Sequence, residues 1–192
     1  LQYSRENTID IMRVRRQCAF DRFLVRIFSS EIGKTFALKG GYALELRIES
    51  TRTTKDIDLC IQKEREKDID LKSIRSTLME LVTADFNDFF EFQIGNPIMD
   101  LENAPYGGYR FPVETYMAGR LFISFHVDVA VGDTWLKPHS QLVSHDWLNF
   151  AGIPTITFQA ISSEQQFAEK MHSYTLKLRL TGQITEIGHA MA

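Results

Sequence analysis

Apolar residues recur along the chain with a helical period in some stretches and with strict alternation in others. Helical spacing and runs of good helix formers predict helices over residues 7–30, 42–47, 70–84 and 162–180. Alternation and short apolar runs predict strands over residues 36–38, 57–61, 89–94, 109–117, 120–131 and 155–160, with a hairpin turn at Ala118-Gly119. Because strands and helices mix without regular βαβα alternation, the pattern predicts an α/β (α+β) fold with a mixed sheet.

Alternation of side chains places carboxylates on one face of two predicted strands. Asp56 and Asp58 point the same way, and Asp128 lies on the even-numbered face of a strand whose odd positions, from Leu121 onward, are apolar. If the two strands are neighbours, the three carboxylates converge on one polar face. Like charges packed together are costly unless a cation neutralises them, and hard oxygen ligands suit Mg²⁺ or Mn²⁺.

Carboxylates that share one face can bridge two metals about 3.5–4 Å apart, one at the attacking hydroxyl and one at the triphosphate. Two further features of the sequence suit phosphate chemistry. Gly40-Gly41 at a strand-to-helix junction lets backbone N–H groups approach phosphate oxygens. Lys170 on the last predicted helix is a candidate counter-charge for the triphosphate.

Simpler explanations exist for several of these residues. The four letters of residues 56–59 recur at residues 68–71, where capping of the following helix explains the acids. The first copy instead follows two glycines and a threonine-rich loop and enters an apolar strand, which favours a site there. An exposed strand face is an alternative for Asp128, and His126, which stands beside Asp128 on the polar face, either assists the site or is a simple hydrogen-bond partner. Either Ser162 or Ser163 can cap the last helix.

Charge narrows the class of protein. A formal net charge of −3, from 22 Lys+Arg and 25 Asp+Glu, excludes a strongly basic DNA-coating or membrane-surface protein. Residues 1–26 carry six arginines against three acids, which we interpret as a solvated helix face that is compatible with an RNA-binding arm. The acidic balance still allows triphosphate handling, because divalent cations would reverse the local sign at the carboxylates.

Length and composition predict one domain over residues 1–192, with a core at about 33–135 and a C-terminal strand and helical part at about 150–192. No apolar run approaches the length needed to cross a bilayer, and the N-terminus is polar, so we expect a cytoplasmic protein without membrane contact. Cys18 and Cys60 stand among apolar neighbours and are expected to be buried free thiols.

Four segments together resemble a known family: residues 39–44, 52–59, 126–128 and 164–172. In this order they are similar to the nucleotidyltransferase AbiEii/AbiGii toxin family, within the DNA polymerase β-like nucleotidyltransferase superfamily. The resemblance extends from about residue 33 to residue 174, and its specificity lies in the ordered set. It implies a mixed-sheet nucleotidyltransferase core with an N-terminal helix and a helical C-terminal part.

The resemblance also implies an activity: Mg²⁺-dependent transfer of a nucleoside monophosphate from an NTP to an acceptor hydroxyl, such as a tRNA 3′ end. It implies a toxin of a toxin–antitoxin or abortive-infection system, with a separately encoded protein antitoxin. The implied metal ligands are Asp56, Asp58 and Asp128, which with Lys170 are the implied catalytic residues. The implied nucleotide-binding residues are Lys39, Gly40, Gly41, Thr54 and Lys170.

The chain departs from the family pattern at two places. Tyr42 stands where a small Ser or Thr usually follows the two glycines, so one phosphate-binding hydroxyl is missing. The family commonly continues beyond the lysine helix with a Lys-Asp or Arg-Asp motif, which residues 180–192 lack. We therefore expect 192 residues to hold the core motifs but not the whole family architecture. A catalytically degenerate module that binds nucleotide, RNA or protein is the alternative hypothesis.

Overall fold

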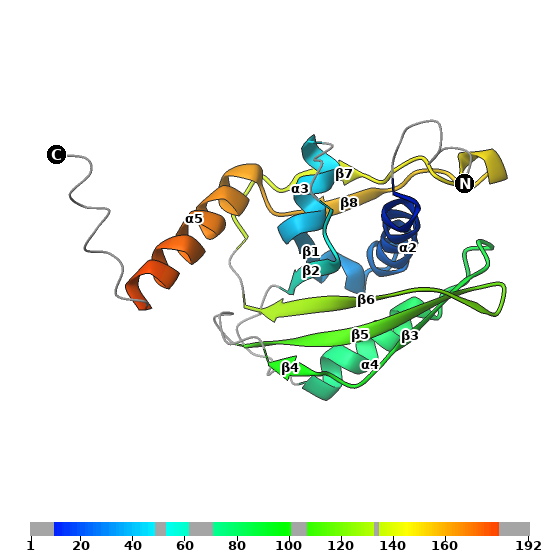
Figure 1. Cartoon of the computed structure of the whole chain (residues 1–192), viewed down its shortest axis with the longest axis horizontal. Coiled ribbons are helices and arrows are strands. Elements are labelled where there is room, and N and C mark those ends of the chain that lie inside the picture. The colour runs from blue at the N-terminus through cyan, green and yellow to red at the C-terminus, as the bar shows by residue number, and fades with distance from the viewer. Residues whose placement is uncertain (1–9, 49–52, 62–70, 101–106, 133–134, 181–192) are drawn as a thin grey trace.

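The computed structural model describes residues 10–48, 53–61, 71–100, 107–132 and 135–180 (Figure 1). The helices are α2 (Ile11–Phe28), α3 (Gly40–Ile48), α4 (Leu71–Val82) and α5 (Ser163–Leu180), with 3-10 turns at Ile32–Thr35 and Asn149–Ala151. The strands are β1 (Phe36–Lys39), β2 (Asp56–Ile61), β3 (Phe90–Ile94), β4 (Met99–Asp100), β5 (Gly108–Met117), β6 (Arg120–Val131), β7 (Ser140–Val143) and β8 (Thr157–Ala160).

All eight strands belong to one sheet, in the order β3-β5-β6-β2-β1-β8-β7, with β4 paired to β5. The pairs β2–β6 and β1–β8 are parallel and the other pairs are antiparallel. The predicted α/β fold with a mixed sheet is therefore confirmed. In Figure 1, α5 runs outward from the end of β8, away from the sheet.

Helices α2 and α4 pack on the sheet face formed by the odd-numbered side chains of β6. Phe20 of α2 is the centre of this core, with its ring 4.9 Å from the rings of both Tyr42 and Phe125. Edge-to-face contacts of this kind add to the hydrophobic gain of burying large rings. One face of the sheet is thereby covered, and the polar positions of β2 and β6 lie on the other face.

The predicted helices are present with shifted ends. Helix α2 begins at Ile11, where Asp10 accepts a hydrogen bond from the backbone N–H of Met12 at 3.0 Å, and residues 7–9 lie outside the described residues. Ser162, of the two candidate serines, caps α5 by accepting from the N–H of Gln165 at 3.1 Å. The second acidic copy, at residues 68–70, also lies outside the described residues.

Strands β4 and β7 were not predicted, because they are only two and four residues long and show no clear alternation. Both are recognised by their backbone pairing, β4 with β5 and β7 with β8. The sequence pattern along β6 also fails at one point. A register shift opposite Thr115 and Tyr116 leaves Leu121 58% exposed, while Phe122 packs against the core.

The interpretation of the N-terminal arginines as a solvated helix face is wrong for two of them. Arg22 and Arg26 are buried, and both donate to the carboxylate of Asp88, at 2.6 Å and 2.8 Å. Burial alone would raise the pKa of Asp88, but the hydrogen bonds from both guanidinium groups lower it below its usual value. The basic stretch is therefore partly internal, stabilised by a buried ion-pair network.

The expectation that both cysteines are buried thiols is confirmed. Cys18 and Cys60 are both buried thiols rather than members of a disulfide, and burial, assisted by the charge of Asp21, raises the pKa of Cys18 to about 12. Across the ranges described, no helix combines the length and the apolar character that crossing a membrane requires.

Candidate active site

The carboxylates of β2 and β6 face one another across a parallel strand pair. Asp58 is the register partner of Asp128, and Asp56 is the partner of His126. Paired residues of adjacent strands lie about 5 Å apart at the backbone, with their side chains on the same face. The predicted neighbourhood of the two strands is thus confirmed, and Asp56, Asp58 and Asp128 project from one polar face.

Asp58 is a carboxyl group whose ionised form is disfavoured by its surroundings. Burial, followed by the negative charge of Asp128, raises its pKa to about 6. Its Oδ2 accepts one hydrogen bond, from the backbone N–H of Gly41 at 3.2 Å. Lys39 is the register partner of Asp58 on β1, and its charge partly offsets the rise. A nearby positive charge would therefore stabilise the ionised form of Asp58.

The two glycines allow the start of α3 to come close to the carboxylate. Gly40 has a φ of +64°, and a Cβ there would lie 1.9 Å from Oδ2 of Asp58. A Cβ on Gly41 would lie 2.7 Å from Oγ1 of Thr54, which itself donates to the carbonyl of Asp56 at 3.1 Å. The first N–H groups of a helix have no partner within the helix, so this turn presents donors beside the carboxylates.

Arg110 on β5 joins the site, although we did not predict it from the sequence. Its Nε donates to Oδ1 and its second guanidinium nitrogen to Oδ2 of Asp128, both at 2.7 Å. The same nitrogen lies 3.5 Å from Oδ2 of Asp56. These carboxylates, the hydrogen bonds to Asp128 first, raise the pKa of Arg110 above its usual value. Arg110 is therefore a cation bound between two of the predicted metal ligands.

A bulge in the β5–β6 hairpin brings Arg110 to Asp128. Met117 and Arg120 pair next to the turn, so a regular hairpin would set Arg110 opposite Val127. A register shift between Thr115 and Tyr116 instead makes Asp128 the partner of Arg110. Because a slip of one residue turns a side chain to the other face, the bulge decides which residue the guanidinium meets. The sequence signal that could have pointed to Arg110 was a single arginine on the predicted strand 109–117, which forms a hairpin with the strand of Asp128.

His126 is a hydrogen-bond partner of a site carboxylate. Its Nδ1 lies 3.2 Å from Oδ1 of Asp56, its register partner on β2, so the interpretation of His126 as a hydrogen-bond partner is confirmed. The cross-strand partner is nearer than Asp128, because residues two apart along one strand are separated by nearly 7 Å.

Lys170 is not brought into contact with the carboxylates. It is exposed on α5, with Nζ 5.4 Å from the ring centre of Tyr174. One helical turn earlier, Gln166 donates to the carbonyl of Gly40 at 2.5 Å and accepts from Arg47, which also donates to the carbonyl of Ile161. Residues four apart share a helix face, so Lys170 follows Gln166 on the face of α5 that touches the glycine turn.

The donor set fits a divalent cation in chemistry, since three carboxylates converge and burial disfavours the charge of Asp58. The positions of these side chains, however, do not fit a bound ion. Within the described ranges, no three His, Cys, Asp or Glu side chains are grouped closely enough to hold an ion. Both oxygens of Asp128 accept from Arg110, so this carboxylate is already engaged by a positive charge of the chain itself.

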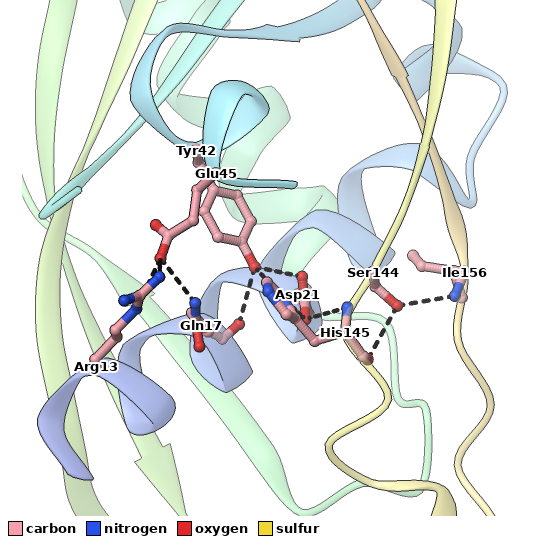
Figure 2. A network of polar contacts seen from close by, with 8 residues as sticks. All are labelled: Arg13, Gln17, Asp21, Tyr42, Glu45, Ser144, His145 and Ile156. Atoms are coloured by element: carbon pink, nitrogen blue, oxygen red, sulfur yellow. Dashed lines mark hydrogen bonds and ion pairs between the residues drawn. The ribbon is translucent and has the colours of Figure 1, made fainter. Parts of the chain in front are cut away.

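Tyr42 points away from this site and anchors α3 to α2. Its hydroxyl donates to Oδ1 of Asp21 at 2.6 Å, and Oδ2 of Asp21 accepts from the backbone N–H of His145 at 3.0 Å (Figure 2). Burial raises the pKa of Asp21, while the bonds from His145 and Tyr42 oppose the rise. Tyr42, which departs from the family pattern, therefore fixes the helix that begins at the glycine turn to α2 in the core.

Comparison with known proteins identifies the family. The sequence profile of the nucleotidyl transferase AbiEii toxin, type IV toxin–antitoxin system, matches residues 22–183. The chain belongs to the AbiEii family. This confirms the resemblance that the four ordered segments suggested, and it makes the chain a nucleotidyltransferase-toxin family member. A search of curated proteins finds no match for this AbiEii chain.

Similar proteins are found among the solved structures. MenT4, a nucleotidyltransferase toxin of Mycobacterium tuberculosis, is similar with a TM-score of 0.54 at 20% identity, covering 82% of this chain and 51% of MenT4. JHP933 of Helicobacter pylori is similar with a TM-score of 0.49 at 11% identity, covering 84% of this chain and 56% of that protein. The chain thus spans about half the length of the solved structures it matches.

Proposed function

We propose that this AbiEii protein transfers a nucleoside monophosphate from an NTP to an acceptor hydroxyl with the help of Mg²⁺ or Mn²⁺. The observation that carries the proposal is the register pairing of Asp58 with Asp128, next to Asp56 and to the Gly40-Gly41 turn. Phosphoryl transfer suits this arrangement, because converging carboxylates can hold divalent cations and the N–H groups at the start of a helix can bind phosphate oxygens.

In this mechanism, Asp56, Asp58 and Asp128 are the residues that would hold the metal. A divalent cation in such a site polarises the transferred phosphoryl group and lowers the pKa of the attacking hydroxyl. The N–H groups at the start of α3 bind triphosphate oxygens, and Thr54 holds the loop that leads into β2. Lys170 stands one helical turn after Gln166, which binds the glycine turn, and would supply a counter-charge to the triphosphate from that face of α5.

The acceptor and the biological role rest on family membership. We propose an RNA acceptor, such as a tRNA 3′ end, and action as a cytoplasmic toxin that is counteracted by a separately encoded antitoxin. The family profile names a type IV toxin–antitoxin system and supports the role of toxin.

Label transfer tests the proposal. The protein is incubated with Mg²⁺, total RNA and each α-labelled NTP in turn, and transfer of label to RNA from at least one NTP is the expected result. Asp58→Asn is expected to abolish transfer, whereas Glu91→Gln, which removes an exposed carboxylate on β3, leaves it unchanged. Equal transfer by Asp58→Asn would reject the site, and no transfer from any NTP would reject the activity for this chain.

The second candidate function is a binding module that has lost turnover. It is favoured by one observation, the engagement of both Asp128 oxygens by Arg110. Titration calorimetry separates the two candidates, because a binding module binds NTP without forming a labelled product. In that case Asp128→Asn would leave the NTP affinity nearly unchanged.

A further inference from the structure

The ion pair between Arg110 and Asp128 is built into the sheet rather than formed by loose surface groups. The two residues are register partners on adjacent strands, and their side chains are 27% and 13% exposed. Both donor-to-acceptor distances are 2.7 Å, the fork geometry in which a guanidinium binds a carboxylate most strongly. The fork also lies 3.5 Å from Asp56, so it is held between two carboxylates.

A divalent cation and this guanidinium compete for the same oxygens. A metal of this kind binds carboxylate oxygens at about 2.1 Å, and Arg110 binds both Asp128 oxygens at 2.7 Å. Both cations on one carboxylate would therefore stand within about 5 Å of each other. At that separation the two positive charges repel each other strongly where solvent screening is limited.

We infer that Arg110 is an internal cation that occupies Asp128 and must release it before a divalent metal can bind there. The inference rests on the proposed function for the class of metal. Arg110 lowers the affinity of the site for the metal, because the free energy of breaking the Arg110–Asp128 fork is subtracted from that of metal binding. Arg110 thus controls metal loading, although it is not itself a metal ligand.

The test is a Mn²⁺ titration of the whole chain at pH 7.5, with free Mn²⁺ measured by electron paramagnetic resonance. Arg110→Gln is expected to bind Mn²⁺ at least about tenfold more tightly than the wild-type protein. Arg120→Gln is the matched control, since it removes the same charge about 25 Å away at the start of β6. We expect Arg120→Gln to change the affinity less than twofold.

A double variant separates competition at Asp128 from a general effect of charge. In an Asp128→Asn background, Arg110→Gln is expected to give a gain in Mn²⁺ affinity of less than about threefold, because only the charge of Arg110 near Asp56 is then removed. A gain as large in that background as in the wild type, or an affinity of Arg110→Gln equal to or weaker than wild type, would overturn the inference. If Arg110→Gln does not fold, Arg110→Lys keeps the charge without the fork and is expected to bind Mn²⁺ more tightly than wild type. An unchanged affinity of Arg110→Lys then overturns the inference.

Failure of this inference can be distinguished from failure of the proposed function. If label transfer depends on Asp58 but Mn²⁺ affinity does not respond to Arg110, the transferase proposal stands and the competition fails. If neither wild type nor Arg110→Gln binds Mn²⁺, both the metal site and the competition are rejected.

Discussion

Replacing Asp58 by asparagine is expected to stabilise the fold while it removes a carboxylate from the site. Burial and the charge of Asp128 raise the pKa of Asp58 from its usual 3.8 to about 6. Because each pKa unit corresponds to about 1.4 kcal/mol, the ionised side chain destabilises the folded state by about 3 kcal/mol at neutral pH. Asparagine has a similar shape and keeps an oxygen that can accept from the N–H of Gly41.

The sign of this pH-dependent change in the unfolding free energy follows from proton binding. Between about pH 4 and pH 6 the folded state holds a proton on Asp58 more tightly than the unfolded state does. The stabilising effect of the proton is complete below pH 4 and is lost as pH rises through 6. The difference in unfolding free energy between Asp58→Asn and wild type should therefore be near zero at pH 4 and reach about 1–3 kcal/mol in favour of the variant at pH 7.

Urea unfolding in EDTA at several values of pH between 4 and 7.5 measures this difference. Asp56→Asn is the control, because Asp56 is 30% exposed, lies 3.2 Å from His126 and has Arg110 nearby, and it should bring no stabilisation. A variant Asp58→Asn that is no more stable than wild type at pH 7 would refute the reasoning. So would a gain in stability that does not change with pH.

Three further substitutions probe the core, the turn and the last helix. Asp88→Asn should destabilise the fold by about 3–5 kcal/mol at pH 7, measured by urea unfolding, because Arg26 loses its buried partner. Gly40→Ala should abolish label transfer and lower the thermal midpoint, because its Cβ would lie 1.9 Å from Asp58 Oδ2 and φ is +64°. Gln166→Ala should raise the KM for NTP in the transfer assay while leaving the thermal midpoint within a few degrees, because α5 loses its bond to the glycine turn.

Each of these three has a matched control. Asp146→Asn removes an exposed carboxylate and should leave stability unchanged. Gly119→Ala carries the same backbone cost at φ +72° with nothing within 4 Å of the new Cβ, so it should cost less than Gly40→Ala and leave transfer intact. His172→Ala alters an exposed residue of α5 and should not change the KM. Equal effects in a variant and its control would contradict the corresponding prediction.

Much of the fold could be predicted from local patterns. Alternation along β2 and β6 assigned Asp56, Asp58 and Asp128 to polar faces, and helical spacing located α2, α4 and α5. Strands β4 and β7 were missed because short strands carry little pattern of their own. Arg22 and Arg26 were misinterpreted because a helical arginine in a sequence does not reveal a buried partner 62 or more residues away.

The sequence by itself determined which residues could carry the chemistry: the Asp-x-Asp strand, the Gly-Gly turn, Asp128 and the family to which their order belongs. Only the tertiary structure decided how they meet. The pairing of β2 with β6 set Asp58 against Asp128, and one bulged residue in the β5–β6 hairpin set Arg110 against Asp128 rather than Val127. The physical reason is that residue faces follow from local alternation, whereas strand register is chosen by backbone pairing and core packing across the whole sheet.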